Sequence, residues 1–206
     1  AVAEAKRRNP RTPQAVFDFI EETLQLQNIM DFDEEDRRQL IEFVMKFQQV
    51  TGPVMAKSVE DTAFYIYNRL VSLNEVGGEP QQFGIELTEF HEHNLSHKRR
   101  WPRAMLATST HDTKRSEDVR ARINVLSELP DEWRDHLDRW RDINVGAKVE
   151  IDGMLSPDRN DEYLLYQTLL GVWPMEQETE VTEEFRERIV EYMLKATKEA
   201  KVHTSW

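Results

Sequence analysis

The apolar positions near the start of the chain follow the period of an α-helix. Phe17, Ile20 and Leu24 recur three and four residues apart, which places them on one helical face. Thr12-Pro13 precedes them as an N-cap residue followed by proline at the first helical position. The pattern predicts a first helix over about residues 13–30.

A second apolar stripe follows at once. Leu40, Val44 and Phe47 share one helical face, and Asp33 stands where its carboxylate can cap the helix. We expect a helix over about residues 33–49. Two consecutive helices joined by a short connection should form an antiparallel hairpin.

The helical period returns from Ser116 onward. Glu117 and Asp118 would occupy the first helical turn, where the helix dipole favours negative charge. We expect further helices around Trp133, over about residues 163–170, and after a cap at Thr182. The apolar positions that mark these helices are Val119, Ile123 and Leu126; Trp133, Leu137 and Trp140; and Phe185, Ile189, Tyr192, Met193 and Ala196.

Two short apolar runs interrupt the helical pattern. The first, Val54-Met55-Ala56, follows the breakers Gly52 and Pro53 and leads into a polar stretch, and the second occupies residues 104–108. Each is short enough to be a strand that ends in a functional loop. The chain is therefore expected to be mainly α, with one or two short strands.

Composition narrows the class of protein. The chain has 206 residues, of which 39% are hydrophobic, so it can bury a core, and its formal net charge of −12 argues against a nucleic-acid partner. The absence of cysteine excludes disulfides and cysteine-based zinc sites. No apolar run approaches the roughly 20 residues of a membrane helix. We expect a cytoplasmic protein without a cofactor.

Thr110-His111-Asp112 is the strongest candidate for chemistry. A carboxylate beside an imidazole, at the end of a short strand, is where barrel enzymes place catalytic groups. The polar residues that surround the pair suit hydrogen bonding to a polyhydroxylated ligand. The alternative from composition is structural, with Asp112 as a helix cap.

A second polar stretch, residues 57–62, runs into the aromatic residues Phe64 and Tyr65. Carboxylates and a lysine can bind sugar hydroxyls, and aromatic rings can cover the apolar face of a pyranose. This stretch is a candidate sugar subsite. A solvated loop followed by a core aromatic helix would have the same composition.

Four blocks of the sequence resemble the malto-oligosyltrehalose synthase family of the alpha-amylase superfamily. The resemblance runs from about Val50 to Trp206, and the first fifty residues match less distinctively. The blocks are residues 54–65, 68–78, 107–120 and 162–174.

The resemblance implies a (β/α)8 barrel to which any strands of this chain would belong. We expect residues 1–50 to form a helical hairpin, 51–130 a late barrel segment with the His-Asp motif, and 131–206 a helical subdomain. The activity that the resemblance implies converts the reducing-end α-1,4 linkage of a malto-oligosaccharide into an α,α-1,1 linkage. The route is an intramolecular, retaining transglucosylation.

The resemblance also implies roles for individual residues. Asp112 would be the catalytic carboxylate that stabilises the transition state, and His111 would bind the same sugar. The remaining substrate-binding residues that it indicates are Lys57, Glu60, Asp61, Phe64, Tyr65, Lys114 and Arg115.

The chain departs from the family pattern in one decisive respect. The nucleophilic Asp and the acid/base Glu belong to earlier motifs, and nothing before Val54 resembles them. The start without Met and the end at a bulky Trp206 fit an internal to C-terminal piece of a longer enzyme. The remainder of that barrel would be its partner, and the piece alone should be inactive.

Two rival interpretations remain open. His93 and His97 are spaced to place two imidazoles on one helical face, with His91 nearby, as in some metal sites. The other rival is a helical carbohydrate-binding or interaction module with no catalytic residue, in which Asp112 is a helix cap.

Overall fold

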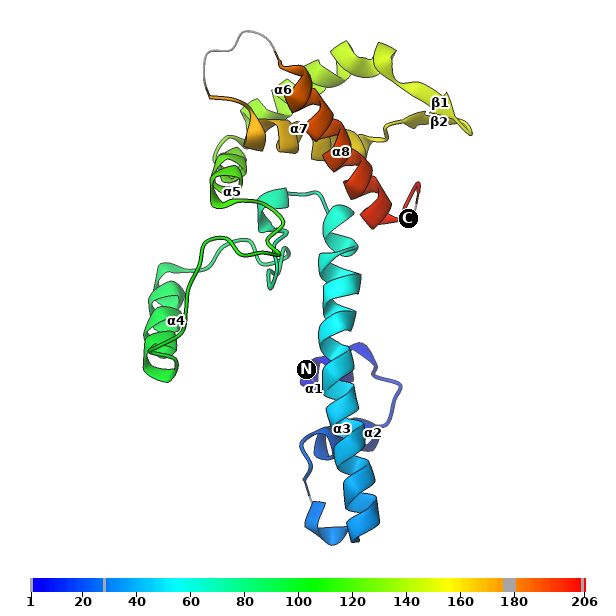
Figure 1. The fold of residues 1–206 in the computed structure, drawn as a ribbon, viewed down its shortest axis with the longest axis vertical. Helices are drawn as coiled ribbons and strands as arrows, with labels where there is room; N and C mark the ends of the chain where they lie inside the picture. Colours follow the sequence, from blue (N-terminus) through cyan, green and yellow to red (C-terminus); the bar gives the residue numbers. More distant parts are fainter. Residues whose placement is uncertain (1, 28, 176–180, 205) are drawn as a thin grey trace. The chain divides into compact units, whose positions relative to one another are not determined.

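The computed structural model describes residues 2–27, 29–175, 181–204 and 206, and the chain divides into two compact units, Ala1–Ala56 and Lys57–Trp206 (Figure 1). Their elements are mainly helices. The fold class expected from the sequence, mainly α with one or two short strands, is confirmed.

Among its described residues, the first unit contains three α-helices: α1 (Val2–Arg8), α2 (Gln14–Leu24) and α3 (Glu34–Met55). A 3-10 turn, η1 (Ile29–Asp31), precedes α3. The predicted cap of α3 is confirmed, because the Asp33 carboxylate accepts the backbone N–H of Asp36 at 2.9 Å. Helix α2 is shorter than expected. It stops when Leu26 takes a left-handed conformation (φ 55°), and the N–H of Gln27 then closes back on the Glu22 carbonyl.

The strand expected at Val54-Met55-Ala56 does not form. Helix α3 continues through Gly52 and Pro53 to Met55, and Ala56 opens a π-helical turn, η2 (Ala56–Glu60). Proline has no N–H, so it removes one helical hydrogen bond without forbidding the next turn. The Ala56 N–H restores the pattern by donating to the carbonyls of Gly52 and Pro53. The helix-breaking residues Gly52 and Pro53 therefore do not end helix α3.

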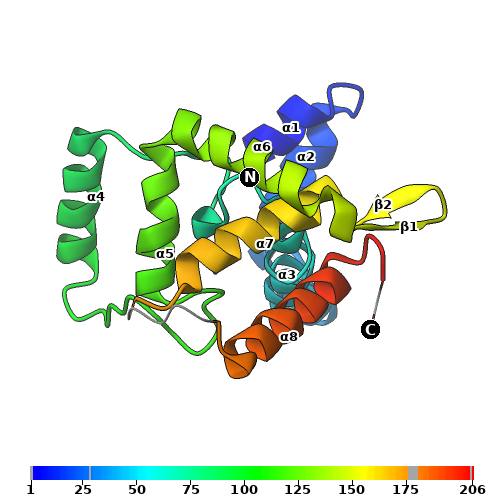
Figure 2. The ribbon, with the colours of Figure 1, turned by 90° about the horizontal axis from the view of Figure 1, so that it is seen from above.

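The second unit contains five α-helices among the described residues, joined by short 3-10 turns (Figures 1 and 2). Residues 63–73 form two 3-10 turns, η3 and η4, rather than one helix. The elements are η3 (Ala63–Tyr65), η4 (Val71–Leu73), α4 (Leu87–Arg100), α5 (Glu117–Asn124), η5 (Val125–Ser127), α6 (Pro130–Asn144), η6 (Val145–Ala147), α7 (Arg159–Val172) and α8 (Glu183–Ala200).

The second strand expected from the sequence, at residues 104–108, has no regular structure either. Met105 and Leu106 are almost fully exposed, at 98% and 82%. A strand needs a paired neighbour to satisfy its backbone groups, and no described segment pairs with this run. In the described part of the chain, the run is an exposed connection to the His-Asp turn.

Over the residues that the structure describes, two strands form, and they make a hairpin that the apolar pattern did not indicate. β1 (Val149–Ile151) pairs antiparallel with β2 (Met154–Ser156), with Glu150 opposite Leu155. Asp152-Gly153 makes the turn with positive φ at both positions, 52° and 78°. An Asp-Gly pair between short strands is a strong hairpin signal, so the sequence did contain the information.

The core of the second unit gathers residues from distant parts of the chain. Helices α5 and α7 lie side by side in both ribbon views and pack closely at Gly171, where an added Cβ would lie 2.8 Å from Val119 (Figures 1 and 2). A small cluster of buried residues joins α6 to α7 through Trp133, Leu137 and Tyr166. The larger cluster of buried residues consists of Tyr65, Leu70, Val71, Ile123, Leu164, Ala196 and Ala200.

One buried amide fixes the irregular segment before the site. The side chain of Gln167, on α7 and fully buried, accepts the N–H of Val71 at 2.9 Å and donates to the carbonyl of Asn68 at 2.8 Å. This segment has little helix or strand of its own to satisfy its backbone groups. Gln167 therefore supplies two of the hydrogen bonds that regular structure would otherwise provide.

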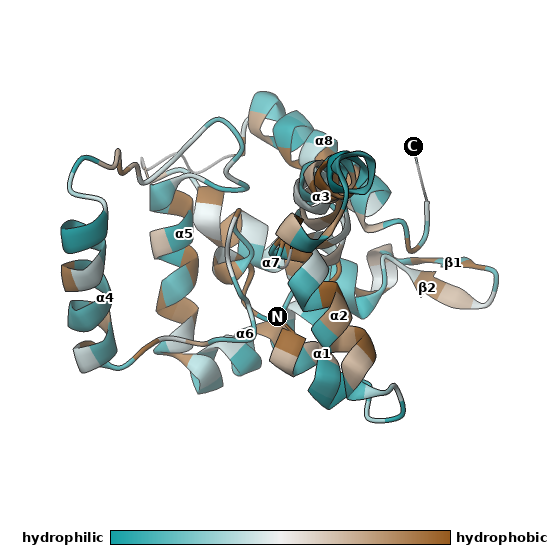
Figure 3. Cartoon of the chain, turned by 90° about the horizontal axis from the view of Figure 1, so that it is seen from below, coloured by the Kyte–Doolittle hydropathy of each residue, from teal (hydrophilic) through white to brown (hydrophobic). Residues whose placement is uncertain are grey.

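Many large apolar side chains remain exposed on both units. Apolar and polar residues are interspersed along the helices of both units (Figure 3). Helix α3 illustrates this, because Phe43, Met45 and Val50 are each more than half exposed while Val44 is buried. None of the helices in the described ranges combines the length and apolar composition that crossing a bilayer requires.

We expect Gln167→Leu to lower the free energy of unfolding by about 3 kcal/mol. Leucine keeps the volume but leaves a buried N–H and a buried carbonyl without partners, and each such group costs ~1–3 kcal/mol. Urea denaturation of the two proteins measures the difference. Gln82→Leu, at an exposed position of the same unit, is the matched control and should change stability little. Equal effects of the two substitutions would contradict the anchoring role of Gln167.

Candidate functional site

His111 and Asp112 occupy the centre of a tight turn. The N–H of Thr113 donates to the Thr110 carbonyl at 3.3 Å, and the Thr113 hydroxyl donates to the same oxygen at 2.9 Å. Both central residues are exposed, and neither side chain has a hydrogen-bond partner among the described residues. The carboxylate of Asp112 is therefore available to a ligand.

Asp112 is not the cap of the following helix. Helix α5 begins at Glu117, and the residue in the N-cap position is Ser116, four residues beyond Asp112. The structural alternative raised by the sequence required Asp112 to accept hydrogen bonds at that helix start. This premise of the alternative is wrong.

Glu75 holds the chain immediately after the turn. Its Oε1 accepts the backbone N–H of Lys114 at 2.8 Å, and its Oε2 accepts that of Arg115 at 3.3 Å. The guanidinium of Arg120, on α5, donates to Oε2 at 3.1 Å. Sequence reasoning missed Glu75, since a single acidic residue in a Gly-containing loop carries no distinctive pattern.

The surroundings of Glu75 favour its ionised form. Burial by itself raises the pKa of the carboxyl, but the backbone N–H groups of Lys114, Val76 and Arg115, with Arg120, outweigh it. The pKa of Glu75 therefore lies below the ordinary value of 4.5. At neutral pH the Glu75 carboxylate that accepts these hydrogen bonds is therefore ionised.

Lys114 and Lys57 share one carboxylate, that of Asp61. The Nζ of Lys114 lies 2.7 Å from one oxygen and the Nζ of Lys57 lies 2.6 Å from the other. Lys114 also stands over the ring of Tyr65, 5.7 Å from its centroid. The hydrogen bond to Asp61 raises the pKa of Lys57, and the negative charge of Asp112 adds a smaller contribution. Three of the predicted site residues are thus brought together, with Asp112 within electrostatic reach.

Phe64 and Tyr65 are buried, and Glu60 is partly buried. The Glu60 carboxylate accepts the Gly77 N–H at 3.0 Å. Phe64 and Tyr65 are 4% and 9% exposed, and burial raises the pKa of the Tyr65 hydroxyl to about 12. The carbonyls of Phe64 and Tyr67 accept hydrogen bonds from the Asn74 amide. In the described chain these residues contribute to the packing and hydrogen bonding of the segment next to the turn.

Arg115 is likewise engaged within the fold. Its guanidinium donates to the Val71 carbonyl at 3.1 Å and to the Tyr192 hydroxyl at 2.8 Å. These contacts connect the end of the turn to η4 and α8. The predicted substrate-binding side chains therefore divide into an exposed or half-exposed group, His111, Lys57 and Asp61, and an inward group that includes Arg115.

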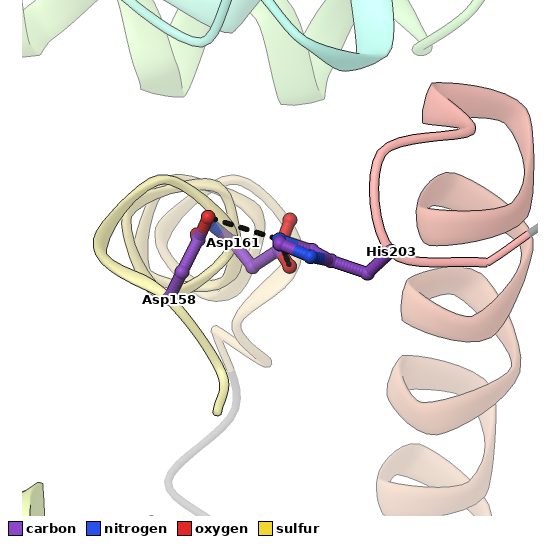
Figure 4. Close-up of side chains that lie close together, drawn as sticks. All are labelled: Asp158, Asp161 and His203. Carbon is purple, nitrogen blue, oxygen red and sulfur yellow. Dashed lines mark hydrogen bonds and ion pairs between the residues drawn. The ribbon is translucent and has the colours of Figure 1, made fainter. Parts of the chain in front are cut away.

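The histidines considered for a metal site lie elsewhere, on α4. The rings of His93 and His97 stack with centroids 6.4 Å apart. A different cluster, Asp158, Asp161 and His203, brings three potential ligand atoms within 4.8 Å of one another (Figure 4).

That cluster already has a structural explanation. One oxygen of Asp158 caps α7 by accepting the N–H groups of Asn160 and Asp161, and the other lies 3.0 Å from the His203 ring. Burial raises the pKa of Asp161, and the negative charge of Asp158 adds to this effect. The cluster joins the start of α7 to the segment after α8.

A cavity of about 880 Å³ lies between α5, α6 and α7, and Asp112 does not line it. Its walls are mostly apolar and include Trp133, Trp140 and Trp173. Hydrogen-bonded polar groups are found instead around the exposed turn. The candidate site is therefore the turn and not this cavity.

Comparison with known proteins gives one consistent class, the enzymes named as trehalose-forming synthases. No family model matches the chain. A candidate maltooligosyl trehalose synthase from Mycobacterium tuberculosis is 46% identical over 162 residues, which are 79% of this chain and 20% of the relative. The chain thus spans about a fifth of the length of the curated relatives it matches.

The solved structures that this chain resembles are also named maltooligosyl trehalose synthases. A hypothetical maltooligosyl trehalose synthase from Sulfolobus tokodaii is 40% identical, with a TM-score of 0.67 over 92% of this chain and 27% of that one. The maltooligosyltrehalose synthase from Arthrobacter ramosus is 38% identical, with a TM-score of 0.69 over 100% of this chain and 23% of its own. These comparisons confirm that the chain resembles part of the maltooligosyl trehalose synthases, as its motifs indicated.

We expect Asp61→Asn to lower the free energy of unfolding by about 1 kcal/mol near neutral pH, between the effects of exposed and of buried charged hydrogen bonds. Hydrogen bonds from Lys114 and then Lys57 hold the pKa of Asp61 below its ordinary 3.8. The stabilisation is therefore complete above pH 3.8 and is lost as the pH falls through the lower folded-state pKa.

Urea denaturation at a series of pH values tests this expectation. The parent chain and the Asp61→Asn variant should differ near neutral pH and converge toward the acid end. Asp152→Asn, in the hairpin turn where asparagine tolerates a φ of 52°, is the control and should show no such convergence. A difference that stays constant across the pH series would sink the ion-pair explanation.

Proposed function

We propose that the chain is the part of a maltooligosyl trehalose synthase that supplies the transition-state-stabilising carboxylate, Asp112. The enzyme would convert the reducing-end α-1,4 linkage of a malto-oligosaccharide into an α,α-1,1 linkage. The observation that carries the proposal is the placement of Asp112, exposed at the centre of a turn whose next residues are fixed by Glu75. The similarity to the named synthases supports it.

The chemistry explains why such a carboxylate is needed. In a retaining glycosyl transfer, positive charge develops at the anomeric carbon as the linkage breaks, while a nucleophilic carboxylate and an acid/base group act on either side. A further fixed carboxylate stabilises that charge and accepts hydrogen bonds from the sugar hydroxyls. Asp112 takes this role, and the other two acids come from outside residues 1–206.

The neighbouring side chains suit a polyhydroxylated substrate. His111 adjoins Asp112 in the sequence and can bind the same sugar. Lys57 and Asp61 offer a donor and an acceptor, and Lys57 lies within electrostatic reach of Asp112. Lys114 and Glu60 contribute through the ion pair with Asp61 and through the hydrogen bond from Gly77. Phe64, Tyr65 and Arg115 act from the interior, by holding these groups in place.

The same proposal assigns residues 51–130 to a late segment of a barrel, between a helical hairpin over 1–50 and a helical subdomain over 131–206. It requires no cofactor. We place the enzyme in the cytoplasm, and the absence of cysteine, which suits a reducing compartment, supports this.

Asp112→Asn in the full-length enzyme should lower kcat/KM at least about 100-fold, since electrostatic groups at such sites are worth ~3 kcal/mol or more. The amide keeps the shape of the side chain but removes its charge. The rate of trehalose-type product formation from a malto-oligosaccharide is the measurement. Asp118→Asn, an exposed Asp six residues further on, is the control and should leave the rate unchanged. A rate that survives Asp112→Asn would favour a non-catalytic carbohydrate-binding module instead.

The 206-residue chain by itself should be inactive on malto-oligosaccharides, because a single stabilising carboxylate without nucleophile and acid/base supports little concerted catalysis. Product analysis after prolonged incubation with the purified chain measures this. The full-length enzyme under the same conditions is the positive control. Any measurable formation of the α,α-1,1 linkage by the chain would refute the expectation.

A further inference from the structure

Glu75 connects two loops that are far apart in the sequence. Its carboxylate accepts three hydrogen bonds from the segment after the His-Asp turn, from the N–H groups of Lys114 and Arg115 and from the Arg120 guanidinium. It also accepts its neighbour's N–H, that of Val76, at 2.8 Å. Two adjacent peptide N–H groups on one carboxylate fix both the position and the orientation of the peptide units between them.

The backbone of Glu75 is itself held in place. Its carbonyl accepts the Gly78 N–H at 2.7 Å, and its own N–H donates to Leu73 at 3.0 Å. A Cβ at position 78 would lie 2.8 Å from the Glu75 carbonyl oxygen, so only glycine fits this close return of the chain. The adjacent residue, Asn74, is 1% exposed and donates to two carbonyls of the preceding segment.

The peptide groups that Glu75 binds lie close to Asp112 in the sequence. Lys114 and Arg115 follow Asp112 by two and three residues. Thr113, directly after Asp112, closes the turn by donating its N–H to the Thr110 carbonyl. With the turn closed at one end and the two peptide N–H groups fixed at the other, the Asp112 backbone has little freedom. On the opposite side, Arg120 also donates to the Thr108 carbonyl, so that one guanidinium joins Glu75 to the segment that enters the turn.

We propose that Glu75 is a positioning residue that sets the place of Asp112 through its hydrogen bonds to the Lys114 and Arg115 peptides. The inference rests on the proposed function of Asp112 and adds a residue that acts on it without touching the substrate. The required property is an ionised carboxylate, whose two acceptor oxygens share one negative charge. A glutamine at this position offers one acceptor and turns an N–H₂ donor toward the remaining N–H donors.

The test uses the full-length enzyme with Glu75→Gln, Asp112→Asn and the double variant. Loss of positioning should lower kcat roughly 10- to 100-fold, in line with the cost of misplacing a catalytic group by about 1 Å, and should change KM much less. If Glu75 acts through Asp112, Glu75→Gln should have little further effect on kcat in the Asp112→Asn background. Active-site concentration, measured in parallel, separates a slower enzyme from a smaller folded fraction.

Two further variants complete the design. Glu79→Gln is the matched control, an exposed Glu four residues further on, and should leave kcat unchanged. Glu75→Asp keeps the charge on a shorter side chain and should retain more of kcat than Glu75→Gln. If Glu75→Gln does not fold, Glu75→Asp decides the question by the same cycle.

The outcomes distinguish the two proposals. If Asp112→Asn retains the parental rate, the proposed function of Asp112 fails and the positioning role fails with it. If Asp112→Asn is slow but Glu75→Gln behaves like Glu79→Gln, only the positioning role is overturned. Independent, multiplicative effects of the two substitutions on kcat would also overturn it.

Discussion

The segment over residues 68–78 contains only one short 3-10 turn, so its peptide groups depend on side chains for their hydrogen bonds. Gln167 supplies partners for Asn68 and Val71, and Asn74 satisfies the carbonyls of Phe64 and Tyr67 from within. Glu75 then uses its charge to organise the loop after Asp112. Buried or half-buried polar side chains thus supply the backbone hydrogen bonds that a helix or sheet would supply elsewhere.

This construction explains how an exposed carboxylate can be precisely placed. The side chain of Asp112 has no hydrogen-bond partner among the described residues, yet the peptides that follow it are fixed by an anionic acceptor. Positioning comes from the backbone below, and the carboxylate oxygens remain available to a ligand. In the proposed site, the group that meets the substrate is separate from the groups that hold it.

Ion pairs around the turn also help to hold its side chains in place. The chain carries a formal net charge of −12, but cationic groups gather around the turn, where Lys114 and Lys57 pair with Asp61 and Arg120 pairs with Glu75. Lys114 is mostly covered, and its side chain is only 10% exposed. Each buried or half-buried cation has a carboxylate or several oxygens beside it, which limits the cost of removing it from water.

The sequence alone determined the local features of this protein. The caps at Asp33 and Thr182, the helices that follow them and the resemblance carried by residues 107–120 depend on neighbours a few residues apart. Even the missed hairpin had a local signal in Asp152-Gly153. Tertiary structure decided the rest, because the contacts involved join distant residues: Arg115 reaches Tyr192, Phe64 and Tyr65 enter the interior, and Glu75 binds the loop beyond Asp112. A single carboxylate in a loop has no periodic pattern, so only the folded chain shows which peptide groups it holds.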